Sequence, residues 1–148
     1  KKKKRKLYKQ AINSKDALEL IGLGYKKVNI LENIDLPVIS KILSIIKNDF
    51  NFTVNKNSYC ILEKTSNEGH KWHVDTGSKN HMAWCQVGAS ILIDSKKEED
   101  VIYYRDEEVV RFKYDMVTHS SDVEHMVKGS VNRIVYLIFI WWKQLTII

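Results

Sequence analysis

Residues 133–142 read Arg-Ile-Val-Tyr-Leu-Ile-Phe-Ile-Trp-Trp. From Ile134 to Trp142 the nine residues are all apolar. An extended strand with this composition is apolar on both faces, which is typical of a strand that lies deep inside a β assembly. A helix that spans a bilayer needs about 20 apolar residues, so this segment is too short for one and we expect no membrane contact. The segment therefore predicts a buried central strand.

Short β-rich runs precede this strand, and they begin near Asn57. Clusters of turn-forming residues separate them, and no helical periodicity stands between them. A series of this kind predicts a mainly β fold, namely a sandwich, a jelly roll or a barrel. The predicted strands before the last one cover residues 59–65, 71–76, 85–94, 101–105, 109–112 and 116–119.

The first third of the chain has helical patterns. Ser14 is a candidate cap for a short helix over residues 15–21, which Gly22 ends. Asp35 is a candidate cap for a second helix, with Pro37 in its first turn. Apolar residues recur there at helical spacing, so we expect this helix to pack on the outside of a sheet. They are Leu36, Ile39, Leu43, Ile46 and Phe50.

The net charge of +6 comes from one end of the chain. Six of the 24 Lys and Arg residues stand at positions 1–6, which leaves 18 basic residues against 18 acidic ones. We expect residues 1–10 to form a basic, disordered tail and residues 11–148 to form a single domain with a helical N-terminal flank. A nucleic-acid partner is then expected only through Lys1–Lys6. The apolar content of 44% excludes disorder throughout the chain.

Cysteine usage points to a reducing compartment. The chain has two cysteines, Cys60 and Cys85, which do not form a CxxC pair or a disulfide framework. No apolar segment of the kind found in signal peptides follows the basic run. We therefore expect an intracellular, cytoplasmic protein.

His73 and Asp75 stand two residues apart in the segment Trp72-His73-Val74-Asp75-Thr76-Gly77. Alternate residues of a strand point to the same face, so this imidazole and this carboxylate can reach one metal ion. His125 follows after 49 intervening residues. Two histidines and one carboxylate on one face of an ion leave three coordination positions open, as in non-haem iron(II) oxygenases.

Arg133 opens the apolar strand and shares a face with Val135, Leu137 and Phe139. A guanidinium on such a face needs an anionic partner, because an unpaired buried charge is costly. That partner is either a protein carboxylate or a small dicarboxylate ligand, which arginine binds with two parallel hydrogen bonds. His119 is an alternative third ligand, but only His125 stands eight residues before Arg133, so we favour His125.

These motifs in this order resemble the 2-oxoglutarate/iron(II)-dependent oxygenases, and most of all the prolyl 4-hydroxylase-like group. The resemblance covers about residues 57–142 and includes the segment Asp115-Met116-Val117 before His125. It implies a double-stranded β-helix, which is a jelly-roll or cupin-like fold, with N-terminal helices packed on it. It also implies that His73, Asp75 and His125 hold Fe(II), and that Arg133 holds the far carboxylate of the co-substrate 2-oxoglutarate.

The resemblance also implies an activity. A dioxygenase of this family hydroxylates its substrate and releases succinate and CO2, with ascorbate as a reductant. With about 148 residues the site has little room for a lid, so a peptide or protein side chain is favoured over an enclosed small molecule. Two alternatives stay open. One is a non-catalytic, cupin-like metal-binding module, since the same ligands also suit Zn(II); the other is a nucleic-acid-associated protein acting through its basic tail.

Overall fold

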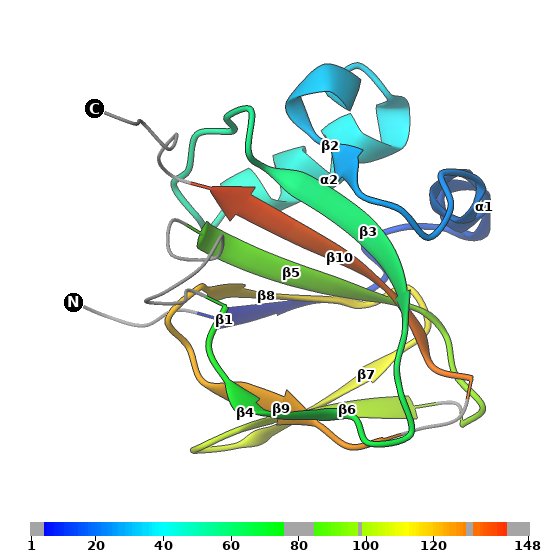
Figure 1. The fold of residues 1–148 in the computed structure, drawn as a ribbon, viewed down its shortest axis with the longest axis vertical. Helices are drawn as coiled ribbons and strands as arrows, with labels where there is room; N and C mark the ends of the chain where they lie inside the picture. Colours follow the sequence, from blue (N-terminus) through cyan, green and yellow to red (C-terminus); the bar gives the residue numbers. More distant parts are fainter. Residues whose placement is uncertain (1–4, 76–84, 98, 130–131, 142–148) are drawn as a thin grey trace.

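The computed structural model describes residues 5–75, 85–97, 99–129 and 132–141, and these form two facing antiparallel β-sheets with helices on one side (Figure 1). In these residues the larger sheet has six strands in the order β1-β8-β5-β10-β3-β2, and the smaller has four in the order β4-β9-β6-β7. The strands are β1 (Arg5–Tyr8), β2 (Val28–Asn29), β3 (Tyr59–Lys64), β4 (His70–His73), β5 (Cys85–Asp94), β6 (Glu99–Tyr104), β7 (Glu108–Phe112), β8 (Met116–Ser120), β9 (His125–Val127) and β10 (Ile134–Trp141). This architecture confirms the predicted mainly β, jelly-roll fold.

Two α-helices and a short 3-10 helix precede most of the strands. They are α1 (Ser14–Gly22), η1 (Leu31–Asn33) and α2 (Pro37–Lys47). The N-cap of α1 is Asn13 and not Ser14, because Asn13 and Asp16 form a reciprocal capping box at 2.9 and 3.1 Å. Helix α2 begins at Pro37, where the missing N–H costs nothing, and Leu36 takes the N-cap position instead of Asp35.

The core shows why the last strand is apolar on both faces. Tyr136, Ile138 and Ile140 of β10 are buried in one cluster with the apolar residues of α1 and α2. Val135, Leu137 and Phe139 point to the opposite side and line a pocket. The prediction that the second helix packs on the outside of a sheet is therefore confirmed, and both helices lie on the side of the larger sheet away from the smaller one (Figure 1).

The expected tail is wrong for Arg5–Tyr8, which form β1 and pair with β8 at the edge of the larger sheet. Acidic residues of the turn after β6 compensate the charge of Arg5. The Arg5 guanidinium donates two hydrogen bonds to the Asp106 carboxylate, at 2.7 and 2.8 Å, and lies 4.5 Å from the centre of the Tyr104 ring. Lys1–Lys4 lie outside the described residues, so the proposed role of Lys1–Lys6 in binding nucleic acid stays a prediction.

Other predicted boundaries agree to within a few residues, and β5 has the predicted range. Thr76 and Trp142, which ended two predicted strands, lie outside the described residues. The three-residue strand β9 was not predicted. Among the helices that the structure describes, none has both the length and the apolar character needed to span a membrane.

Candidate metal centre

His73 and His125 are direct neighbours across two strands. The smaller sheet pairs β4 with β9 in antiparallel register, and His73 stands opposite His125. Opposite residues of an antiparallel pair bring their side chains close together, and the two ring centres are 4.3 Å apart. Sheet register therefore joins two histidines that lie far apart in the sequence.

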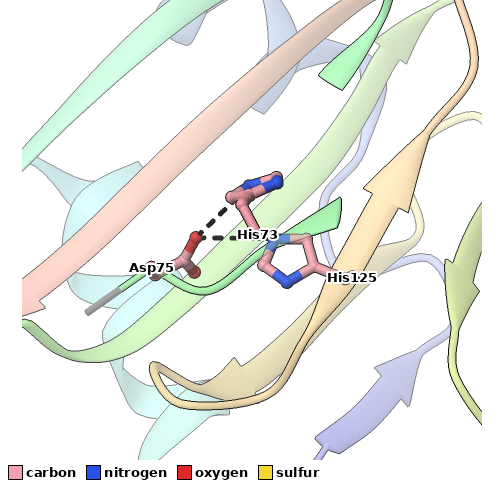
Figure 2. A group of neighbouring side chains, drawn as sticks. All are labelled: His73, Asp75 and His125. Carbon is pink, nitrogen blue, oxygen red and sulfur yellow. Dashed lines mark ion pairs between the residues drawn. The ribbon is translucent and has the colours of Figure 1, made fainter. Parts of the chain in front are cut away.

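Asp75 completes the group from just beyond the end of β4. Its backbone N–H donates a hydrogen bond to the carbonyl of Ser121 at 2.8 Å, and the residue is buried. Its Oδ1 atom lies 3.9 Å from Nε2 of His73 and 3.4 Å from Nε2 of His125 (Figure 2). One ligand atom from each residue fits within 4.8 Å of the others. The structure thus brings together the three residues that the sequence singled out.

Backbone carbonyls fix the orientation of both imidazole rings. Nδ1 of His73 lies 2.6 Å from the carbonyl of Lys71, and Nδ1 of His125 lies 2.9 Å from the carbonyl of Val123. A carbonyl only accepts, so each Nδ1 carries the proton in these bonds and each Nε2 keeps its lone pair. Metal-binding histidines typically donate their other ring N–H to an acceptor such as a backbone carbonyl, and both Nδ1 atoms have such an acceptor here.

A third histidine, His119 of β8, contacts the carboxylate of Asp75 from the opposite side. Its Nε2 atom lies 2.8 Å from Oδ2 of Asp75, and its ring is almost fully buried. Burial lowers the pKa of His119, which favours the neutral ring. The sequence considered His119 only as an alternative to His125; the structure places both rings beside Asp75, with their centres 4.2 Å apart.

The surroundings keep Asp75 ionised and shift the pKa values of His73 and His125 in opposite directions. Burial alone raises the pKa of Asp75, but the contacts with His119 and His125 outweigh it and hold the pKa well below its usual range. Burial lowers the pKa of His73. Burial also acts to lower the pKa of His125, but the Asp75 carboxylate overcomes this effect and raises it.

Arg133 comes just before β10 and is buried, with 3% of its surface exposed. Its Nε and Nη2 atoms donate to the two carboxylate oxygens of Asp100 at 2.8 and 3.0 Å, and Nη1 donates to the hydroxyl of Thr65 at 2.6 Å. The protein-carboxylate partner considered from the sequence is thus Asp100. These bonds use three of the five N–H groups of the guanidinium, so two N–H groups make no bond to the described residues.

Arg111 of β7 shares the same carboxylate. Its Nε atom donates to Oδ2 of Asp100 at 2.9 Å and its Nη1 atom to the carbonyl of Ser90 at 2.6 Å. Nη2 of Arg111 is buried and has no hydrogen-bond partner among the described residues. Burial lowers the pKa of Arg111 to about 10, which leaves it charged at neutral pH. Two buried guanidinium groups therefore face one carboxylate, and this cluster has an excess positive charge.

Sequence reasoning missed Asp100 and Arg111. Asp100 follows a charged run, Lys96-Lys97-Glu98-Glu99, and none of the motifs picked out from the sequence includes it. Arg111 interrupts the apolar residues of its strand much as Arg133 opens its own. A guanidinium among apolar residues needs an acidic partner, and this argument, which was applied to Arg133, also holds for Arg111 and could have identified it.

One pocket connects Arg133 with the group of His73, Asp75 and His125, which we call the metal-type cluster. It contains about 640 Å³ of empty space, which includes the open solvent at its mouth. His73, Asp75 and His125 line it, and so does Arg133. Its apolar walls are Ile102 and Val127 from the smaller sheet and Ala89, Val135, Leu137 and Phe139 from the larger sheet.

Comparison with known proteins shows what this fold is similar to. No family model and no curated protein matches the sequence, but the chain has the fold of solved 2-oxoglutarate- and iron(II)-dependent oxygenases. The predicted resemblance is thus confirmed at the level of the fold.

Three solved structures show this similarity. A prolyl 4-hydroxylase from Phytophthora capsici superposes with a TM-score of 0.65 at 13% identity, over 97% of this chain and 63% of that protein. The viral collagen prolyl hydroxylase from Paramecium Bursaria Chlorella virus-1, solved with 2-oxoglutarate, gives 0.67 at 8% identity, over 95% of this chain and 96% of the viral one. A 2OG-Fe(II) oxygenase family oxidoreductase from Burkholderia pseudomallei gives 0.57 at 12% identity, over 94% and 84% of the two chains. This chain therefore spans somewhat under two thirds of the length of the Phytophthora protein.

Proposed function

We propose that this protein is an Fe(II)- and 2-oxoglutarate-dependent dioxygenase that hydroxylates a peptide or protein side chain. The observation that carries the proposal is the single pocket that holds a His-Asp-His cluster and a buried arginine. The donor set of two imidazoles and one carboxylate fits iron(II). Arg133 lines the pocket, and the excess positive charge of its cluster with Asp100 and Arg111 fits an anionic ligand there.

In this proposal His73, Asp75 and His125 are the metal ligands. The carbonyls of Lys71 and Val123 keep the two Nε2 lone pairs directed at the ion, and the lowered pKa of Asp75 keeps its carboxylate ionised. Iron bound there supplies the activation of O2, which couples decarboxylation of 2-oxoglutarate to succinate and CO2 with hydroxylation of the substrate. Ascorbate is the expected reductant for maintaining Fe(II).

Arg133 binds the far carboxylate of 2-oxoglutarate in this proposal. Two of its N–H groups make no bond to the described residues, and Asp100 and Thr65 hold the guanidinium in place. The added carboxylate neutralises the excess charge of the Arg111–Asp100–Arg133 cluster. The apolar walls exclude water from the methylene groups between the two ends of the ligand.

The substrate approaches from the side of His73. The side chain of His73 is 41% exposed, whereas those of Asp75 and His125 are 8% and 11% exposed. An open approach suits a side chain presented on a peptide. Two of the solved structures with this fold are prolyl hydroxylases, which favours proline as the residue modified.

The test is succinate release by the metal-free protein after addition of Fe(II), 2-oxoglutarate and ascorbate under air, with and without proline-containing peptides. We expect turnover with Fe(II) and none with Zn(II). His125→Ala should lose both metal binding and turnover, because it removes one of three ligands. His70→Ala is the control, since it removes a histidine of β4, the strand of His73, that lies outside the ligand set, and it should retain the metal.

Arg133→Met separates the co-substrate site from the metal site. We expect it to retain Fe(II) and to raise the KM for 2-oxoglutarate, because it keeps an unbranched apolar stem and removes the charged guanidinium. Lys113→Met, an exposed charge outside the pocket, is the control. Metal binding without succinate release in the presence of any peptide would contradict the oxygenase and favour the non-catalytic metal-binding module. An unchanged KM in Arg133→Met would remove Arg133 from the co-substrate site.

A further inference from the structure

The carboxylate of Asp75 has two oxygens in different environments. Oδ1 faces the Nε2 atoms of His73 and His125, the group proposed to hold the metal. Oδ2 faces away from them and lies 2.8 Å from Nε2 of His119. His119 comes from β8 of the larger sheet, so this contact joins the two sheets at the metal-type cluster.

A hydrogen-bond chain sets the orientation of His119. Its Nδ1 atom lies 3.2 Å from the hydroxyl of Tyr104, on β6. The carboxylate of Asp75 only accepts, so Nε2 of His119 carries the proton and donates it to Oδ2. Nδ1 then has a lone pair and accepts from the Tyr104 hydroxyl. Both nitrogens are thus engaged, and the ring is buried with 3% of its surface exposed.

Gly88 of β5 makes room for this contact. It is the cross-strand partner of His119. A Cβ atom added at Gly88 would overlap Oδ2 of Asp75 and would lie 3.3 Å from Nε2 of His119. The larger sheet therefore has a residue without a side chain opposite the Asp75–His119 pair, and a larger residue would displace the carboxylate.

We propose that His119 is a positioning residue that occupies Oδ2 of Asp75 and so leaves only Oδ1 for the metal. This inference rests on the proposed function. A carboxylate that binds through both oxygens takes two coordination positions, and one that binds through a single oxygen takes one. With Oδ2 held by His119, the protein supplies three ligand atoms, and three positions of an octahedral ion stay open for ligands from solution.

Two substitutions of His119 separate its two hydrogen bonds. The amide nitrogen of Gln occupies about the place of Nε2, so His119→Gln retains the donor to Asp75. The amide of Asn occupies about the place of Nδ1, so His119→Asn retains the partner of Tyr104 and loses the bond to Asp75. Both variants are polar and uncharged, which makes them a matched pair.

The probe is Mn(II) alone, which favours the same kind of nitrogen and oxygen ligands and reports in two ways. The free ion is counted by electron paramagnetic resonance, and the relaxation rate of water protons measures how many water molecules the bound ion carries. We expect His119→Asn to bind Mn(II) about 10- to 100-fold more weakly than wild type, as loss of a bond to a metal ligand does elsewhere. Bound water should fall by about one third as Oδ2 joins the ion. His119→Gln should stay close to wild type in both measurements.

The outcomes distinguish this inference from the proposed function. A wild-type protein that binds no Mn(II) overturns the metal centre itself. Equal affinity and equal water relaxation in the two folded variants overturn the positioning role of His119 and leave the metal centre intact. If circular dichroism shows that His119→Asn does not fold, Tyr104→Phe decides: it removes only the hydroxyl that orients the ring. A loss of Mn(II) affinity in Tyr104→Phe that is smaller than the loss expected for His119→Asn supports the positioning role of His119. An unchanged Mn(II) affinity overturns that role.

Discussion

The single carboxylate of Asp100 forms ion pairs with two buried guanidinium groups, those of Arg111 and Arg133. Removal of one partner from a buried ion pair typically costs about 3–5 kcal/mol, because it leaves an uncompensated charge. Asp100→Asn leaves both Arg111 and Arg133 without an anion. We therefore expect a loss of that order in the free energy of unfolding, measured by urea denaturation at pH 7.

The same residue predicts a pH dependence. Burial acts to raise the pKa of Asp100, but its bonds to Arg133 and Arg111 lower it overall below the ordinary value of 3.8. The folded state therefore binds this proton less readily than the unfolded state, so the stabilisation is complete above about pH 4 and is lost as the pH falls through the folded-state pKa. The difference in unfolding free energy between wild type and Asp100→Asn should shrink below pH 4.

The control for both measurements is Asp94→Asn. Asp94 is more than half exposed and lies 3.7 Å from the exposed Lys113, so its removal should change stability little at any pH. A constant difference between wild type and Asp100→Asn from pH 7 to pH 3 would show that the carboxylate does not carry the effect.

At the scale of the element, β1 is the edge strand of the larger sheet. Its residues Arg5–Tyr8 cover one edge of β8, the strand that carries His119. Cross-strand pairs contribute about 0.2–1 kcal/mol each, so the four pairs of β1 amount to about 1–4 kcal/mol. Tyr8 adds a hydrogen bond from its hydroxyl to Asp49 at 2.8 Å.

We expect a protein that lacks residues 1–8 to melt several degrees below one that lacks residues 1–4. The comparison of the two truncations isolates β1 from the basic residues before it. Thermal unfolding followed by circular dichroism measures the difference. Equal melting temperatures for the two truncations would show that β1 contributes nothing to stability.

The elements that the sequence predicted well are those whose pattern is local. Strand β10 is apolar on both faces because one face packs on the helices and the other lines the pocket, and ten-residue β5 has an equally clear pattern. The predicted ligands His73 and Asp75 are near neighbours in sequence. In contrast, β1 has the composition of a tail, because the acidic partners of Arg5, Asp106 and Glu107, lie about a hundred residues away in the sequence.

The parts of the site that escaped prediction depend on pairing across the fold. His119 meets Asp75 only because β8 of one sheet faces the end of β4 of the other. Arg133 meets Asp100 in the same way, between the beginning of β10 and β6. No local periodicity records such contacts. The composition of one strand shows that a buried charge needs a partner, but not which residue the partner is.

At the scale of the whole molecule, two polar links cross between the sheets at separate places along β10. The Asp75–His119 link lies beside Gly88, which pairs with Phe139 near the end of that strand. The Asp100–Arg133 link lies at its beginning. Apolar side chains of both sheets line the pocket, and packed interiors resist changes in spacing. The distance between the proposed metal ligands and the proposed anion site is therefore set by the whole sandwich.

This geometry predicts selection among dicarboxylic acids. With Mn(II) bound, 2-oxoglutarate should raise the melting temperature more than oxaloacetate, which is one methylene shorter, or 2-oxoadipate, which is one methylene longer. Equal shifts for the three acids would contradict a fixed spacing. Under the proposed function, the length of the dicarboxylic acid that fits is set by the register of the two facing sheets and so by the backbone of the whole sandwich.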